Sequence, residues 1–155
     1  MKKQHFLTLT FVLFITVLLG FTGRSTTDDG DRLLAIWEPS NGLSRIKIEK
    51  IGTKYYGRIV WLKVPNDPET SKPKVDKNNP DTSMRKAALK GLRILKDFTY
   101  KGKNEWTSGT IYDPKNGKTY SCVITMKDEN NLDIRGYVGI RALGRTDTWK
   151  KYIEK

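Results

Sequence analysis

Short segments in which hydrophobic and polar residues alternate dominate the chain after about residue 32. Alternation with a period of two is typical of a β-strand that buries one face. In residues 43–49, for example, Ile46 and Ile48 alternate with charged residues at positions 45, 47 and 49. The pattern predicts strands at residues 33–37, 43–49, 54–63, 93–100, 105–112, 118–126, 132–138 and 143–152.

Turn residues separate many of these predicted strands. Asn41-Gly42 is a tight-turn signal, and the segments 113–117 (DPKNG) and 128–131 (DENN) are rich in turn formers. Consecutive strands should therefore be antiparallel neighbours. We expect an all-β fold, an eight-stranded antiparallel up-and-down barrel, because closure hides the strand edges; a two-layer sandwich is the alternative.

Two segments depart from the strand pattern. Residues 64–82 contain four of the six prolines, and so long an irregular segment is either a lid over one end of the barrel or a solvated loop. Residues 84–92 (MRKAALKGL) are expected to form one short helix, with Ser83 as its cap and Gly91 near its end.

The N-terminal region has the order of a secretory signal. Lys2 and Lys3 precede an uncharged run, residues 6–21, which is followed by small and polar residues. This run is shorter than the roughly 20 residues that a spanning helix needs. We expect residues 1–23 to be a signal peptide, 24–32 a flexible leader and 33–155 a single barrel domain. The processed protein should be exported to the periplasm or the medium, with no stable membrane span.

Charge adds an expectation about partners. The chain has 29 Lys and Arg against 17 Asp and Glu, a formal net charge of +12, and removing Lys2 and Lys3 with the signal leaves +10. Such a charge favours an anionic partner, and an exported protein would find an anionic component of the envelope rather than nucleic acid. Most basic residues, however, alternate with apolar ones, as on the solvated outside of a barrel.

The residues that most catalytic and metal sites require are scarce. The single histidine, His5, lies in the predicted signal, and the single cysteine, Cys122, shares an apolar face with Ile124 and Met126. We therefore predict a buried thiol, no disulfide, no metal site, no cofactor and no catalytic residue. The protein is not expected to be an enzyme; a hydrolase without histidine would need two carboxylates converging in a cleft.

The segment around Asp76, Asn78 and Asp81 invites a calcium interpretation, which its spacing contradicts. If Asp76 is the first position of a calcium loop, Asp81 stands where glycine is required and Ala87 where the bidentate glutamate belongs. A turn held by Asx side chains explains the segment better.

Aromatic residues supply the candidate binding site. In a closed barrel Trp37 and Trp149 lie on neighbouring strands, where they could plug one end with the guanidinium of Arg145 over an aromatic ring. The other end should be lined by tryptophan and tyrosine rings with a few hydroxyls, as in a small-molecule pocket. The candidate ligand-binding residues are Trp61, Trp106, Tyr112, Ser108 and Thr110. The same residues would also suit an ordinary filled core.

Seven short blocks, in this order and spacing, resemble a bacterial family called domain of unknown function 2147. The blocks are Gly57–Trp61, Asp76–Pro80, Gly91–Leu95, Trp106–Pro114, Gly117–Tyr120, Leu132–Gly139 and Leu143–Trp149. The resemblance implies an exported bacterial protein with a lipocalin-like or calycin-like barrel and no established activity. Lipocalins begin with Gly-x-Trp and pack a late arginine on that tryptophan; Trp37 and Arg145 match these parts, whereas Ala35 replaces the glycine.

Together these observations lead to two functional hypotheses. The first is a protein of the cell envelope that binds a small apolar or amphipathic molecule inside the barrel. The alternative is a protein-interaction or envelope-structural module whose barrel is filled and holds no small ligand.

Overall fold

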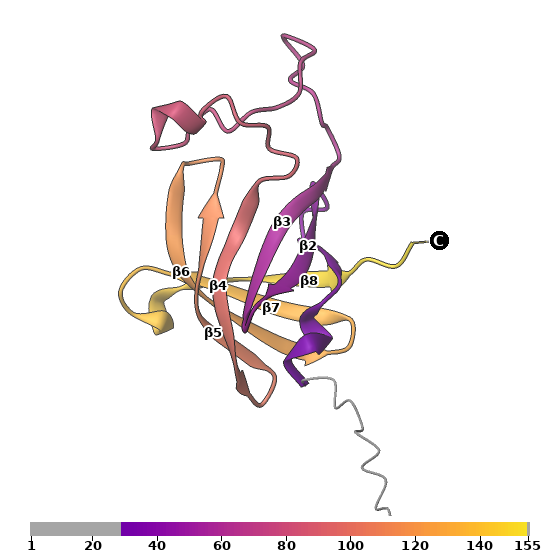
Figure 1. Ribbon diagram of the computed structural model, residues 1–155, viewed down its shortest axis with the longest axis vertical. Coiled ribbons are helices and arrows are strands. Elements are labelled where there is room, and N and C mark those ends of the chain that lie inside the picture. Colours follow the sequence, from indigo (N-terminus) through magenta and orange to yellow (C-terminus); the bar gives the residue numbers. More distant parts are fainter. Residues whose placement is uncertain (1–28, 155) are drawn as a thin grey trace, which may run out of the picture.

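The computed structural model describes residues 29–154 and shows an antiparallel barrel of eight strands (Figure 1). The strands are β1 (Ile36–Glu38), β2 (Ser44–Ile51), β3 (Lys54–Leu62), β4 (Arg93–Gly102), β5 (Glu105–Asp113), β6 (Lys118–Asp128), β7 (Asn131–Tyr137) and β8 (Arg145–Lys151). Each strand pairs with the next, and Trp37 of β1 pairs with Lys151 of β8. The predicted up-and-down barrel is confirmed, because the first and last strands close the sheet, which a sandwich would leave open.

The predicted strands agree with the observed ones except at some ends. The first begins later than expected, since Asp29–Leu33 forms a 3-10 helix, η1, that includes residues assigned to the flexible leader. A second 3-10 turn, η3 (Arg141–Leu143), precedes β8. The predicted signal peptide and the first part of the leader lie outside the described residues.

The helix expected at residues 84–92 is wrong. Only the 3-10 turn η2 (Thr82–Met84) forms there, and Asp81 caps it by accepting a hydrogen bond from the Ser83 amide at 2.9 Å. The rest of the segment folds back on the start of the long β3–β4 loop, where Leu89 N–H donates to Lys74 O and Asp76 N–H to Ala87 O. These long-range partners satisfy backbone groups that a helix would have paired internally.

The end of the barrel beside η1 is filled with side chains. Its fully buried residues include Leu33, Trp37, Phe98 and Trp106, and the Trp37 indole donates to Leu33 O at 3.0 Å. A Cβ at Gly109 would lie 2.4 Å from a carbon of the Phe98 ring, so only glycine lets this ring lie against β5. We call this the filled end. Of the three residues predicted to plug one end, Trp37 lies here.

The cysteine is sheltered, as the sequence predicts. Cys122 is fully buried, and burial raises the pKa of its thiol to about 12. Because the thiolate is the reactive form, we expect native protein to react with a disulfide reagent near neutral pH about 100-fold more slowly than protein in guanidinium. The absorbance of the chromophore that the reagent releases measures both rates. Fast labelling of the native protein would contradict the burial of this thiol.

Candidate ligand-binding cavity

A cavity of about 980 Å³ occupies the barrel end opposite η1, beneath the β3–β4 loop. Figure 1 shows this loop crossing above the strands. The barrel contributes apolar side chains to the cavity wall, and the loop adds three more. The apolar wall includes Ile59, Leu62, Ile94, Ile111, Ile134 and Trp149 from the strands, Leu43 from the β1–β2 connection, and Val64, Val75 and Leu89 from the loop. We call this the open end.

Carboxylates in the cavity wall already accept hydrogen bonds from the protein. Asp147 accepts from the Trp149 indole at 2.9 Å, and Asp113 accepts from the Lys115 amide at 2.9 Å. Asp67 accepts from two amides of its own turn, which lower the pKa of its carboxyl. As the sequence suggested, the Asp113 carboxylate is a turn-stabilising group. These interactions give the acids structural roles.

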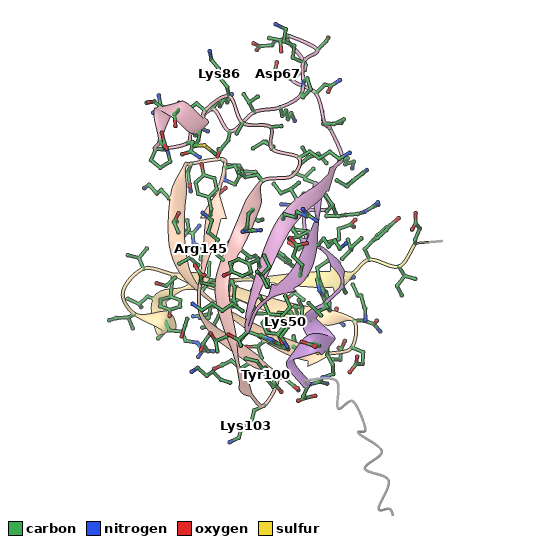
Figure 2. All side chains as sticks on the ribbon, viewed as in Figure 1. Lys50, Asp67, Lys86, Tyr100, Lys103 and Arg145 are labelled. Carbon is green, nitrogen blue, oxygen red and sulfur yellow. The ribbon has the colours of Figure 1, made fainter. Side chains whose placement is uncertain are left out.

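Cations outnumber carboxylates around the cavity. The basic lining residues are Lys72, Lys74, Lys77, Lys115 and Arg145. Arg145 projects from the start of β8, and within residues 29–154 its side chain makes no hydrogen bond or ion pair. Figure 2 shows it between the long loop, which carries Asp67 and Lys86, and the opposite end marked by Tyr100. Its guanidinium is therefore available to an anionic group in the cavity.

A buried hydrogen-bond network ties the loop to the barrel. The Tyr112 hydroxyl donates to Oδ1 of Asp76 at 2.8 Å, and the Asn79 amide donates to Oδ2 at 2.7 Å. Asp76 is fully buried, and it is the one buried charged residue within the described chain. Burial and the bond to Asp76 raise the pKa of Tyr112 to about 12, so its hydroxyl stays a neutral donor near neutral pH.

A second contact holds the same loop over the open end. The Asn78 amide donates to the carbonyls of Pro114 and Lys115 in the β5–β6 turn, at 3.2 and 2.9 Å. A Cβ at Gly117 would lie 2.0 Å from the Asn78 carbonyl oxygen, so the turn needs glycine for this close approach. Of the two alternatives for residues 64–82, the structure has the one in which they cover the open end.

The Asx-turn interpretation of this segment is confirmed. Asp81 N–H donates to the Asn79 side-chain oxygen at 2.9 Å, and the Asp81 carboxylate in turn accepts from Ser83. Asp76 instead accepts from Tyr112 and Asn79, which makes it an anchor of the loop.

Only one of the five predicted ligand-binding residues lines the cavity, namely Tyr112. Trp106 lies at the filled end, where its ring packs against Tyr100 with centroids 4.9 Å apart. Ser108 is exposed and Thr110 half-buried, and neither lines the cavity. The reason is a register shift between Trp106 and Gly109, which breaks the alternation on which their common face was predicted.

Trp61 is also placed away from the cavity. The Arg45 guanidinium carbon lies 4.1 Å from the Trp61 ring centroid and 3.6 Å from that of Tyr152, and Arg45 pairs with Glu38 at 3.0 Å. A register shift in the β2–β3 pairing follows Arg45. The predicted site is therefore not assembled around one cavity.

The expected plug of Trp37, Trp149 and Arg145 is wrong in two of its members. Trp149 and Arg145 line the cavity, while the Lys151 ammonium lies 6.0 Å from the Trp37 ring. Alternation along β8 could have shown from the sequence that these residues line a common cavity, because Arg145, Asp147 and Trp149 share one face of the strand. Their partners across the sheet, Gly136, Ile134 and Leu132, extend that face onto β7.

An up-and-down barrel that is filled at one end and holds a covered cavity at the other defines the lipocalin-like class. The family model described as "Uncharacterized protein conserved in bacteria (DUF2147)" matches residues 35–151, and the chain belongs to this family. The resemblance seen in the sequence blocks is thereby confirmed.

Among solved structures, the chain is similar to protein HP1028 of Helicobacter pylori, whose description assigns it to the lipocalin family. The two share 27% sequence identity with a TM-score of 0.67, over 79% of this chain and 84% of that one. Comparison with curated proteins finds none that matches. Within residues 29–154, no helix has the length and apolar character needed to cross a bilayer.

Proposed function

We propose that this protein binds a small amphipathic molecule in the cavity at the open end, and that it does so in the cell envelope. The observation that carries the proposal is the cavity itself. Its volume of about 980 Å³ is within the range of small-molecule sites, and most of its wall area is apolar, with charged side chains from the loop, the β5–β6 turn and β8. Likeness to a lipocalin-family structure supports binding rather than catalysis.

The distribution of side chains suggests how such a molecule lies. An apolar tail would contact the isoleucines of β3 to β7 and the Trp149 ring. A polar head would lie near Arg145 and the lysines of the loop and the β5–β6 turn. Because the lining carboxylates already accept hydrogen bonds and Arg145 has no partner within the described residues, an anionic head is favoured. The filled end is the feature that supports the alternative, a protein-interaction or envelope-structural module that holds no small ligand.

The test uses a fluorescent fatty acid, 11-(dansylamino)undecanoic acid, and its neutral methyl ester. We expect the acid to bind with a blue-shifted emission and to quench the protein's tryptophan fluorescence. Ile111→Trp should weaken binding of both probes about tenfold or more, because the larger ring takes up cavity volume. Circular dichroism and thermal unfolding check that this variant is folded.

The head group is tested by charge. Arg145→Gln should weaken binding of the acid about tenfold or more and leave binding of the ester nearly unchanged. The reason is that a hydrogen bond to a charged group is worth about 1.5–3 kcal/mol. Arg58→Gln, on β3 and paired with Glu49, is the matched control and should change neither affinity. Binding of neither probe, or equal binding by Ile111→Trp, would remove the cavity as the site.

A further inference from the structure

The loop between β7 and β8 (residues 138–144) presents aliphatic side chains to solvent. Val138 is 77% exposed, Ile140 64% and Leu143 79%, and these three are among the most exposed large hydrophobic residues of the described chain. Figure 1 shows the loop standing out from the barrel beyond the ends of β7 and β8. Exposed aliphatic side chains grouped in one loop are a feature of surfaces that contact a protein or a membrane.

Polar contacts at the base of the β7–β8 loop hold the conformation in which its aliphatic side chains are exposed. The Arg135 guanidinium donates to the carbonyls of Arg141 and Ala142, at 2.9 and 2.8 Å, and to the Thr146 hydroxyl at 2.8 Å. Arg141 forms an ion pair with Glu105 at 2.6 Å. Since the loop carbonyls are bound at its base, the aliphatic side chains stay outside instead of collapsing onto the barrel.

The loop lies beside the mouth of the cavity. In an up-and-down barrel alternate connections share an end, so the β7–β8 loop is at the same end as the β3–β4 loop and the β5–β6 turn. Gly136 and Arg145, which flank the β7–β8 loop, both line the cavity. Leu43 of the β1–β2 connection, another exposed aliphatic residue, lines it as well.

The open end is also the basic end. The β3–β4 loop, residues 63–92, holds seven basic and four acidic residues, and residues 114–117 and 138–144 add one basic residue each. The segments at the filled end hold two basic and three acidic residues. Those segments are residues 29–35, 52–53, 103–104 and 129–130. Connections at the open end thus carry a formal charge of +5, of which the Arg141 charge is paired with Glu105, against −1 at the other.

We propose that the open end docks on an anionic lipid bilayer, with Val138, Ile140 and Leu143 inserted among the head groups. Aliphatic side chains gain by leaving water, and lysines near an anionic surface add an attraction that salt weakens. The inference does not rest on the proposed ligand, although a mouth placed at the bilayer would suit exchange of an amphipathic molecule.

Cosedimentation with vesicles tests the docking. Purified protein should bind vesicles containing about one-third phosphatidylglycerol about tenfold or more tightly than phosphatidylcholine vesicles, and added salt should weaken this binding. The combined variant Val138→Ser, Ile140→Ser and Leu143→Ser should lose about tenfold in affinity. The control variant Ile51→Ser and Ile153→Ser removes exposed aliphatic residues elsewhere and should bind as the unchanged protein does.

Insertion itself is measured with an environment-sensitive dye on Leu143→Cys, which is feasible because Cys122 is buried. Anionic vesicles should shift this dye's emission to the blue, whereas the same dye on Ile51→Cys at the other end of the barrel should not respond. Equal binding by the triple serine variant, or a dye at position 143 that stays in water while the protein binds, would overturn the proposal. So would failure to bind anionic vesicles.

Discussion

Replacing Trp106 with alanine is expected to lower the free energy of unfolding by about 3–5 kcal/mol, since it leaves a large void in the filled end. The ring is fully buried and lies between Tyr100 and Tyr55, with centroid distances of 4.9 and 6.3 Å. Chemical denaturation followed by circular dichroism measures the loss. Affinity of the folded variant for the fluorescent fatty acid should change little, because Trp106 is remote from the cavity.

Two control variants show whether the loss of stability comes from the volume of the Trp106 ring, from its indole N–H, or from removing any tryptophan. Trp106→Phe should lose much less stability, because the indole Nε1 is buried without a hydrogen-bond partner in the described part of the chain. Trp61→Ala should cost about 1 kcal/mol, the scale of a partly exposed cation–π contact. A small loss for Trp106→Ala, or loss of ligand binding by its folded form, would contradict the placement of this ring.

Replacing Asp76 with alanine is expected to release the β3–β4 loop from the barrel. The change leaves the buried Tyr112 hydroxyl without its acceptor, which costs about 1–3 kcal/mol, and it frees the half-buried Asn79 amide at a lower cost. Local opening of the loop should become easier by a similar free energy. Limited trypsin digestion should then cleave after Lys74 or Lys77 about tenfold faster or more.

A double-mutant cycle identifies the bond responsible. Tyr112→Phe alone removes the donor but leaves Asp76 its bond from Asn79, so its effect should be smaller. Combined with Asp76→Ala, the losses should be less than additive by at least about 0.5 kcal/mol. Asp81→Ala, which removes the cap of η2 in the same loop, is the control. Cleavage rates alike in Asp76→Ala and Asp81→Ala would show that the Asp76–Tyr112 bond does not hold the loop.

One end of the barrel is packed with side chains and the other holds a cavity, so stability and the proposed binding function depend on different ends. At the filled end, aromatic rings complete a core that also uses η1. The open end has a cavity instead of a packed core. The β3–β4 loop covers this cavity and is held there by one buried carboxylate and by the backbone of the β5–β6 turn. Substitutions at the filled end should therefore change stability first, and those at the open end binding first.

The strands and their antiparallel order could be predicted from local pattern, whereas closure was expected because it hides the strand edges. Alternation along residues 43–49 or 118–126 decides which side chains face inward, and turn residues such as those at 113–117 decide that neighbours are antiparallel. Cys122 was placed correctly for the same reason, since its strand keeps a regular period of two between Cys122 and Met126. These signals are local, because each depends on residues within a few positions of one another.

The binding site could not be read in this way, because it depends on events that interrupt the local pattern. A register shift after Trp106 separates that ring from Ser108 and Thr110, and no local alternation reveals such a bulge. The helix at residues 84–92 failed for a related reason: the backbone there pairs with residues 74–76, a contact that local propensity does not contain.

The sequence by itself determined that the chain makes eight antiparallel strands and that the thiol is sheltered, because periodicity and turn chemistry act over a few residues. Closure joins β1 to β8, which are far apart in the chain, and the sequence left a sandwich open as the alternative. Only the tertiary structure decided which end is filled and which is hollow. That choice rests on pairs far apart in the chain, such as Asp76 with Tyr112, 36 positions away, and Asn78 with the turn at Pro114. Such pairs exist only once the barrel has closed and brought the β3–β4 loop over its mouth.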